Sequence, residues 1–122
     1  MDILLDTHVL LWYVAGDARL QPSHRILITD NAHPKFVSIA SLWEIAIKTS
    51  AGKLAAVGPL DNLVPANIGI LPVELAHLLR LQTLPYHHRD PFDRLLIAQA
   101  LAENLAVIST DQHFAAYGVA LL

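Results

Sequence analysis

Four acidic residues of this 122-residue sequence are each flanked by apolar residues: Asp6 in ILLDT, Glu44 in LWEIAI, Asp93 in FDRLLI and Asp111 in VISTD. Several carboxylates buried together without a counter-charge cannot all stay ionised. A hard divalent cation, Mg²⁺ or Mn²⁺, removes this cost because it prefers oxygen ligands and keeps waters that a further acid can orient or deprotonate. If the four residues converge, the pattern predicts a metal site suited to phosphodiester hydrolysis.

Short apolar segments alternate with segments of helical periodicity along the whole chain. We predict strands at 3–5, 36–39, 68–73, 106–108 and, as a closing strand, 119–122. We predict helices that begin at Thr7, Pro22, Ala40 and Pro91, of which the one from Pro22 ends near His33. We also predict a helix at 74–84 and a weaker one at 59–67. This order predicts one domain over residues 1–122, a three-layer α/β/α fold with a mainly parallel central sheet. Ligands of such sheets bind at the carboxyl edge of the strands, where the four acids would meet.

Structural roles also account for acids at these positions. Asp90, Pro91 and Asp93 form a good helix start, with Asp90 as the N-cap and an acid favoured by the helix dipole at Asp93. Asp6 and Asp111 can likewise cap the segments that follow them. Independent caps would not need to fall on one predicted edge of the sheet, however. We therefore favour a metal site, with Asp90 as a cap rather than a ligand.

Neighbouring polar residues could assist such a site. The hydroxyls of Thr7 and Thr110 lie next to the acids in sequence and could hold a metal-bound water, and Thr110 is the better candidate. Three basic residues near the acids in sequence could contact phosphate, although ordinary surface charge explains them equally well. These residues are Arg89, Arg94 and Lys48. Lys48 can also form an i, i+4 pair with Glu44.

Composition limits the classes of function. The chain is 54% hydrophobic and 16% charged, which suggests a buried partner interface. No apolar run approaches the ~18 residues of a membrane span, and no basic leader segment opens the sequence, so we expect a cytoplasmic protein. The formal net charge of −3 argues against a nucleic-acid partner. That objection disappears if four of the 11 acids neutralise a metal, since 7 acids then remain against 8 basic residues.

The sequence resembles PIN-domain ribonucleases and, more narrowly, the VapC-like toxins of bacterial type II toxin–antitoxin systems. The segments that carry the resemblance are LLDTHVLLW, SIASLWEIAIKTSAGKL, HRDPFDRLLIAQA and LAVISTDQHF. The resemblance implies a metal-dependent endoribonuclease in which Asp6, Glu44 and Asp93 form the core of an Mg²⁺ or Mn²⁺ site and Asp111 supports it. It also implies a homodimer, inhibited by an antitoxin that inserts a segment near the active site.

Two other classes of function share part of this sequence pattern. A phospho-receiver domain shares the length and an acidic Mg²⁺ pocket, but it needs an acid pair after the first strand and a late lysine. Here Thr7 follows Asp6, and no lysine follows Lys53. A catalytically silent PIN-like binding module is disfavoured only because all four acids are present.

Overall fold

A computed structural model describes residues 1–55 and 58–122. Its sheet has four parallel strands in the order β3-β2-β1-β4: β1 Ile3–Leu5, β2 Lys35–Ser38, β3 Gly69–Leu71 and β4 Ala106–Ile108. The helices are α1 Thr7–Ala15, α2 Pro22–Thr29, α3 Ile39–Ser50, α4 Leu75–Leu81 and α5 Pro91–Glu103, with 3₁₀ helices η1 Leu60–Asn62 and η2 Gln112–Tyr117. The predicted three-layer α/β/α fold is confirmed.

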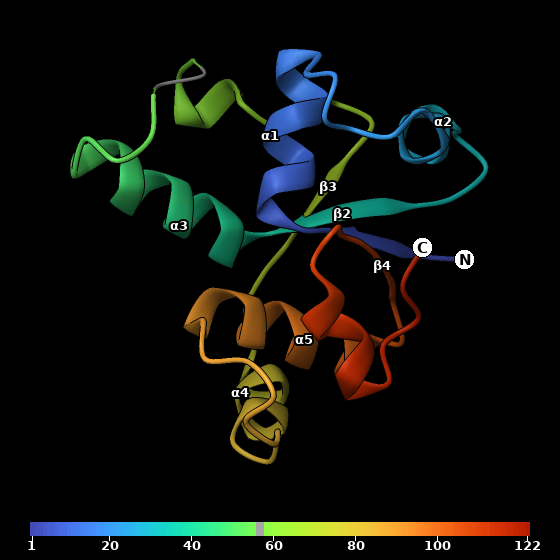
Figure 1. Cartoon of the computed structure of the whole chain (residues 1–122), viewed down its shortest axis with the longest axis vertical. Coiled ribbons are helices and arrows are strands. Elements are labelled where there is room, and N and C mark those ends of the chain that lie inside the picture. The colour runs from blue at the N-terminus through green and yellow to red at the C-terminus, as the bar shows by residue number, and fades with distance from the viewer. Residues whose placement is uncertain (56–57) are drawn as a thin grey trace.

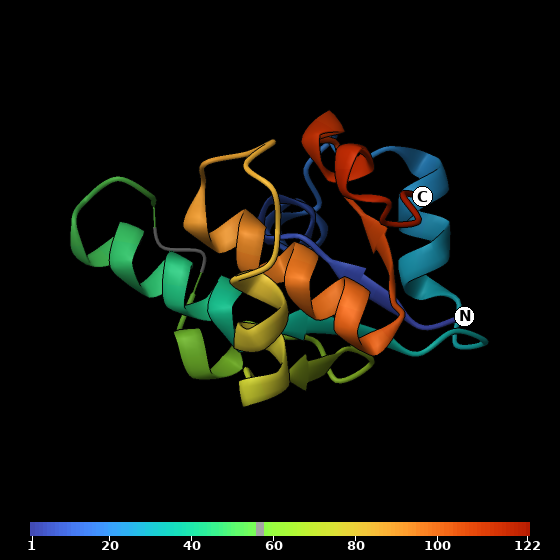
Figure 2. The same ribbon diagram turned by 90° about the horizontal axis from the view of Figure 1, so that it is seen from below.

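The two faces of the sheet carry separate hydrophobic cores, because successive side chains of a strand point to opposite faces. Ile3 and Leu5 of β1 and Ile108 of β4 join the core beneath α1, α2 and α3. Leu4 and Val107 join the core beneath α5 and η2. Figure 1 shows α1 and α2 on one side of the sheet and α4 and α5 on the other, and Figure 2 shows α5 lying across the strands. Both faces are covered, which explains why the strands are apolar without alternation.

Polar caps start the helices directly at the ends of strands. Asp6 follows β1, and its side chain accepts a hydrogen bond from Val9 N in the first turn of α1. Ser38, the last residue of β2, caps α3 by accepting from Ala40 N at 3.0 Å. Because strand and helix are joined without a loop, the carboxyl edge of the sheet is held rigidly.

Three of the predicted helices are shorter than expected. α2 ends at Thr29 rather than near His33, because His33 precedes a proline and is thereby biased away from helical geometry. α4 stops three residues before the predicted end of the 74–84 segment. The 59–67 segment forms only the short helix η1, since Pro65 excludes a continuous helix there.

The predicted closing strand at 119–122 is wrong in extent. Only a single parallel bridge joins Leu121 to Val107. Gly118, with a left-handed φ of 78°, turns the chain immediately before this segment, and few residues remain to pair with β4. Among residues 1–55 and 58–122, no helix has the length and apolar character needed to cross a membrane.

Candidate active site

Asp6 and Asp111 are linked through the hydroxyl of Ser109. Asp6 is only 5% exposed; its Oδ1 accepts from Val9 N at 2.8 Å and its Oδ2 accepts from Ser109 Oγ. The same Ser109 oxygen accepts from Asp111 N at 3.0 Å. The hydroxyl after β4 that donates to Asp6 is therefore that of Ser109. Thr110, the hydroxyl that we predict to hold a metal-bound water, is exposed and, together with Ser109, lines a surface pocket beside α2.

Glu44 is held from both sides inside the protein, where it is 4% exposed. Thr7 donates a hydrogen bond to Glu44 Oε1 at 2.8 Å, and Lys48 Nζ lies 2.7 Å from Glu44 Oε2. The Thr7 oxygen is also 2.9 Å from Ser41 Oγ. Thr7, the residue after Asp6, thus couples α3 to the end of β1. The expected i, i+4 pair between Glu44 and Lys48 is present, and its hydrogen bond raises the pKa of Lys48.

His88 joins Asp93 to Asp111. Its Nε2 lies 2.9 Å from Asp93 Oδ2 and 3.1 Å from Asp111 Oδ2. On the other side, His113 Nδ1 is 2.7 Å from Asp111 Oδ1, and the two imidazole rings stack with centroids 4.6 Å apart. Sequence spacing had singled out neither histidine. The only hint was the bare doublet His87 and His88 just before α5, because the contact to Asp111 spans 23 residues.

Asp90 has the capping role predicted for it. Its Oδ1 accepts from Phe92 N at 2.9 Å and from Asp93 N at 3.2 Å, at the start of α5. This confirmed cap places Asp93 in the first turn of the helix. Asp90 nevertheless acts on the site through its charge, as the pKa of Asp93 shows.

Burial disfavours the charged form of two of the carboxylates, Asp6 and Asp93. Burial raises the pKa of Asp6 above its ordinary value. Burial, followed by the charge of Asp90, raises the pKa of Asp93 to about 6, although the contact with His88 acts in the opposite direction. For Asp111, partial burial acts to raise the pKa, but hydrogen bonds from the His113 backbone and ring and the nearby His88 bring it below its ordinary value. Two of the acids therefore lack sufficient positive charge around them.

This set of donors fits a hard divalent cation. Asp6, Glu44, Asp93 and Asp111 offer carboxylate oxygens, and a nearby cation would offset the burial that raises the pKa of Asp6 and Asp93. Among the described residues, the three possible ligand atoms that lie within 4.8 Å of one another belong to His88, Asp111 and His113, so Asp111 is the one predicted acid in that group. Mg²⁺ takes oxygen ligands, and Mn²⁺ prefers them. The residues present are thus suited to the predicted metal.

Arg94, a predicted RNA contact, is instead engaged inside the protein. It is 6% exposed, and its guanidinium donates to the backbone oxygens of Pro85 at 2.8 Å and Leu84 at 3.3 Å and to Tyr117 Oη at 3.2 Å. Its Cζ lies 3.9 Å from the centroid of the Tyr86 ring. The side chain fastens the loop before α5 to the domain. Arg89 is exposed and Lys48 is partly exposed, so both stay accessible.

We expect Arg94→Ala to lower the free energy of unfolding by about 2–4 kcal/mol, because it leaves buried carbonyl oxygens without donors. Arg94→Lys should recover only part of this loss, since an ammonium group cannot reproduce the planar donor fork. Chemical denaturation measures the effect. Arg89→Ala is the matched control, within about 0.5 kcal/mol of wild type. Equal stability of the Arg94→Ala and Arg89→Ala variants would contradict this role.

The family model of the PIN domain matches residues 3–120. The chain therefore belongs to the PIN domain family. No curated protein matches the sequence.

Solved structures of similar fold come from several bacteria. The VapBC2 complex of Rickettsia felis, bound to a fragment of its promoter DNA, contains a chain with a TM-score of 0.74 and 14% identity, covering 100% of this chain and 98% of that chain. A chain of a toxin–antitoxin complex from Klebsiella pneumoniae has a TM-score of 0.67 and 15% identity, and the match covers 98% of this chain and 95% of that chain. A chain of FitAcB from Neisseria gonorrhoeae has a TM-score of 0.65 and 17% identity, and the match covers 98% of this chain and 96% of that chain. The resemblance to PIN-domain and VapC-like chains is thus confirmed at the level of family and fold.

Proposed function

We propose that this chain is a metal-dependent endoribonuclease toxin that hydrolyses RNA phosphodiester bonds and is neutralised by a cognate antitoxin. One observation carries the proposal. In this PIN domain, Ser109 and His88 link three acids, which are Asp6, Asp93 and Asp111. Thr7 couples Glu44 to the end of the same strand as Asp6. The pKa values of Asp6 and Asp93 are raised. Such a group of buried and partly buried carboxylates is suited to binding Mg²⁺ or Mn²⁺.

In this mechanism Asp6, Glu44, Asp93 and Asp111 hold the cation. When bound, it would activate a water molecule and neutralise charge on the phosphate. The surrounding side chains keep these acids in place. Ser109 orients Asp6, and Thr7 orients Glu44. His88 keeps Asp93 and Asp111 facing one another across the site.

The RNA substrate would meet its basic contacts beside the acids. Lys48 already lies 2.7 Å from Glu44, and the exposed Arg89 directly precedes the cap of α5. Phosphate contacts of this kind position a nucleic acid without selecting its sequence. Neutralisation of the acids by metal would leave the remainder of the chain slightly basic. A cytoplasmic location is the one in which such an enzyme would meet its substrate.

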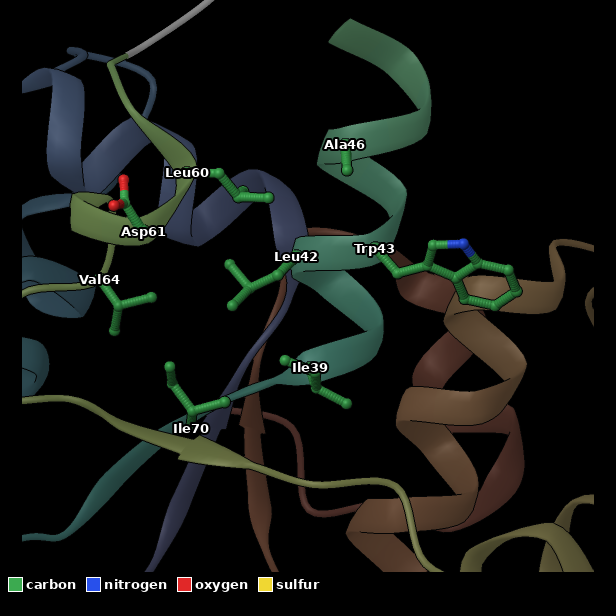
Figure 3. Close-up of a pocket in the computed structure, with 8 residues that line it drawn as sticks. All are labelled: Ile39, Leu42, Trp43, Ala46, Leu60, Asp61, Val64 and Ile70. Carbon is green, nitrogen blue, oxygen red and sulfur yellow. The ribbon is translucent and has the colours of Figure 1, made fainter. Parts of the chain in front are cut away.

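An apolar groove supports the proposed antitoxin partner. A hollow of about 610 Å³ lies between α3, η1 and β3. Figure 3 shows Leu42 and Ile70 pointing into the space between these elements, while Trp43 extends toward α5. The Trp43 ring packs edge-on against Phe92 with centroids 5.2 Å apart, and Phe92 precedes Asp93. A segment of an antitoxin lying in this groove would therefore reach the border of the acidic site. Toxin–antitoxin complexes among the proteins of similar fold support the same partner.

The proposed homodimer is supported by a second apolar surface. Leu75 and Leu79 of α4 are one helical turn apart, and both are largely exposed. Exposed apolar residues grouped in this way are typical of surfaces that bind another protein. We propose that a second copy of the chain packs at the amino-terminal end of α4, which leaves Gln82 and the turn after the helix free.

A panel of defined RNAs, incubated with Mg²⁺ or Mn²⁺ and with or without EDTA, tests the activity. We expect at least one RNA to be cut only in the presence of the metal. Cleavage that EDTA leaves unchanged would contradict metal dependence. Absence of cleavage of every RNA would favour the second candidate, a catalytically silent PIN-like binding module.

The structural roles of the acids give that second candidate its support. Asp6 caps α1, Asp111 caps η2, and Glu44 pairs with Lys48, so each position has a use that requires no chemistry. The raised pKa of Asp6 argues against this view, because an ordinary cap gains nothing from being buried beside other acids.

A further inference from the structure

Tyr86 is a large aromatic side chain that is held in a fixed place yet left in solvent. It is 81% exposed, the highest exposure among the large apolar side chains of the described residues. The guanidinium of Arg94 lies 3.9 Å from its ring centroid and is itself fixed by hydrogen bonds to backbone oxygens of the same loop. A cation against an aromatic ring is attractive and holds the ring in place. Tyr86 is thus a rigid platform with most of its surface free.

A groove of about 320 Å³ adjoins this platform. One wall is aromatic and basic, formed by Tyr86, Arg89 and Arg94, and the other wall is contributed by α4 and the turn that follows it, including Leu78 and Gln82. A flat apolar surface, a nearby positive charge and an amide are the features by which proteins hold an unpaired nucleobase and its phosphate.

The platform is tied directly to the acidic site. Tyr117 Oη accepts a hydrogen bond from His88 N at 2.8 Å and from Arg94 Nη1 at 3.2 Å, so one hydroxyl anchors both His88 and the base of the platform. His88 in turn contacts Asp93 and Asp111. Tyr86 and His88 are two residues apart, a separation of at most about 7 Å along the backbone. A nucleotide on Tyr86 would thus be a near neighbour of a phosphate at the acids.

We propose that Tyr86, backed by Arg94, is a base-stacking subsite that receives an unpaired nucleotide next to the phosphate cut by the enzyme. The inference rests on the proposed function and assigns to it a binding subsite for one unpaired nucleotide. The faces of bases in a duplex are covered by their neighbours, whereas an unpaired base can be turned outward and stacked on an aromatic ring. Arg94, expected from the sequence to touch RNA itself, acts here by fixing the ring that does so.

Fluorescence anisotropy with a labelled single-stranded RNA and a hairpin whose loop is replaced by a non-nucleotide linker, both in EDTA so that nothing is cut, tests the subsite. We expect Tyr86→Ala to weaken binding of the single strand by about 10-fold, as loss of one stacked base does. Tyr86→Phe should stay within about 2-fold of wild type, because the ring is kept. The control is Ile26→Ala, at a side chain that is 66% exposed on α2, and it should bind as wild type does.

Two results would overturn the proposal: unchanged single-strand binding by Tyr86→Ala, or an equal loss for the hairpin stem. A changed elution volume of Tyr86→Ala on size exclusion, with unchanged RNA binding, would assign this face to a protein partner instead. The outcomes also separate this inference from the proposed function. RNA cut with an unaltered KM by Tyr86→Ala would refute the subsite alone. Tyr86-dependent binding without any metal-dependent cleavage would refute the nuclease activity alone.

Discussion

Replacing Asp93 or Asp6 by Asn is expected to lower metal-dependent RNA cleavage by at least about 100-fold. Loss of a group that only supports a metal ligand typically costs 10–100-fold, so loss of a ligand itself should cost no less. Both substitutions preserve the size of the side chain and its ability to accept a hydrogen bond. Val9 N can still donate to the residue at position 6, so the cap of α1 is preserved. Initial rates at saturating Mg²⁺ measure the effect.

Asp90→Asn is the matched control for this experiment. It removes the same charge three residues earlier, and asparagine is as good an N-cap as aspartate. The hydrogen bonds to Phe92 N and Asp93 N can therefore persist. We expect its cleavage rate to stay within a few-fold of wild type. Similar losses in Asp90→Asn and Asp93→Asn would show that total charge, rather than ligands at defined positions, governs the activity.

Asp93→Asn is also expected to make the metal-free protein more stable at neutral pH, by about 1 kcal/mol or about 4 °C in Tm after allowance for the partial solvent exposure of the side chain. The pKa of Asp93 is raised from 3.8 to about 6, so the folded chain binds this proton more tightly than the unfolded chain does. The free energy of unfolding therefore falls as the pH rises from about 4 through about 6, and it stays reduced above that pH. The neutral amide does not carry this penalty.

Thermal melts in EDTA at pH 7.5 and pH 4 measure this difference. The advantage of Asp93→Asn should be present at pH 7.5 and should largely disappear at pH 4, where the wild-type carboxyl is protonated when folded. Adding Mg²⁺ at pH 7.5 should raise the Tm of wild type through binding to the folded state, and that of the variant by less. A variant that is less stable than wild type in EDTA at pH 7.5 would show that Asp93 contributes more to folding than its burial costs.

These two results together would indicate that the acidic site trades stability for function. Functional groups commonly lower the stability of the fold that carries them, and a bound cation would offset that cost here. The same reasoning distinguishes Asp93 from Asp90. Asp90 stabilises the start of α5 through its hydrogen bonds, whereas Asp93 is placed by that cap into a site where its charge is unfavourable.

Local sequence signals were sufficient for most of the fold. Apolar runs that end in a capping residue marked β1 and β4, and the Asp90 and Pro91 pair marked the start of α5. The alternation of strands and helices then implied a parallel sheet and a common edge. The chain end was predicted less well. Pairing of residues 119–122 with β4 depends on a turn at Gly118, and apolar character alone does not report on that turn.

The details of the site depended on geometry that the sequence does not carry. Ser109 and Thr110 are both hydroxyls at the end of β4, and only the local direction of the chain decides that Ser109 contacts Asp6. His88 reaches Asp111 because a loop folds back over the start of α5. Arg94 resembled a surface cation in sequence, but it lies in the buried stripe of α5 and meets the carbonyl oxygens of that loop.

Divalent metal binding by the acids underlies the proposed function, and calorimetric titration of Mn²⁺ into the chain at pH 7.5 measures it directly. We expect saturable binding in wild type, competed by Mg²⁺, retained in Asp90→Asn and lost in Asp6→Asn and Asp93→Asn. Absence of saturable binding in wild type, or unchanged binding in both Asp6→Asn and Asp93→Asn, would contradict it.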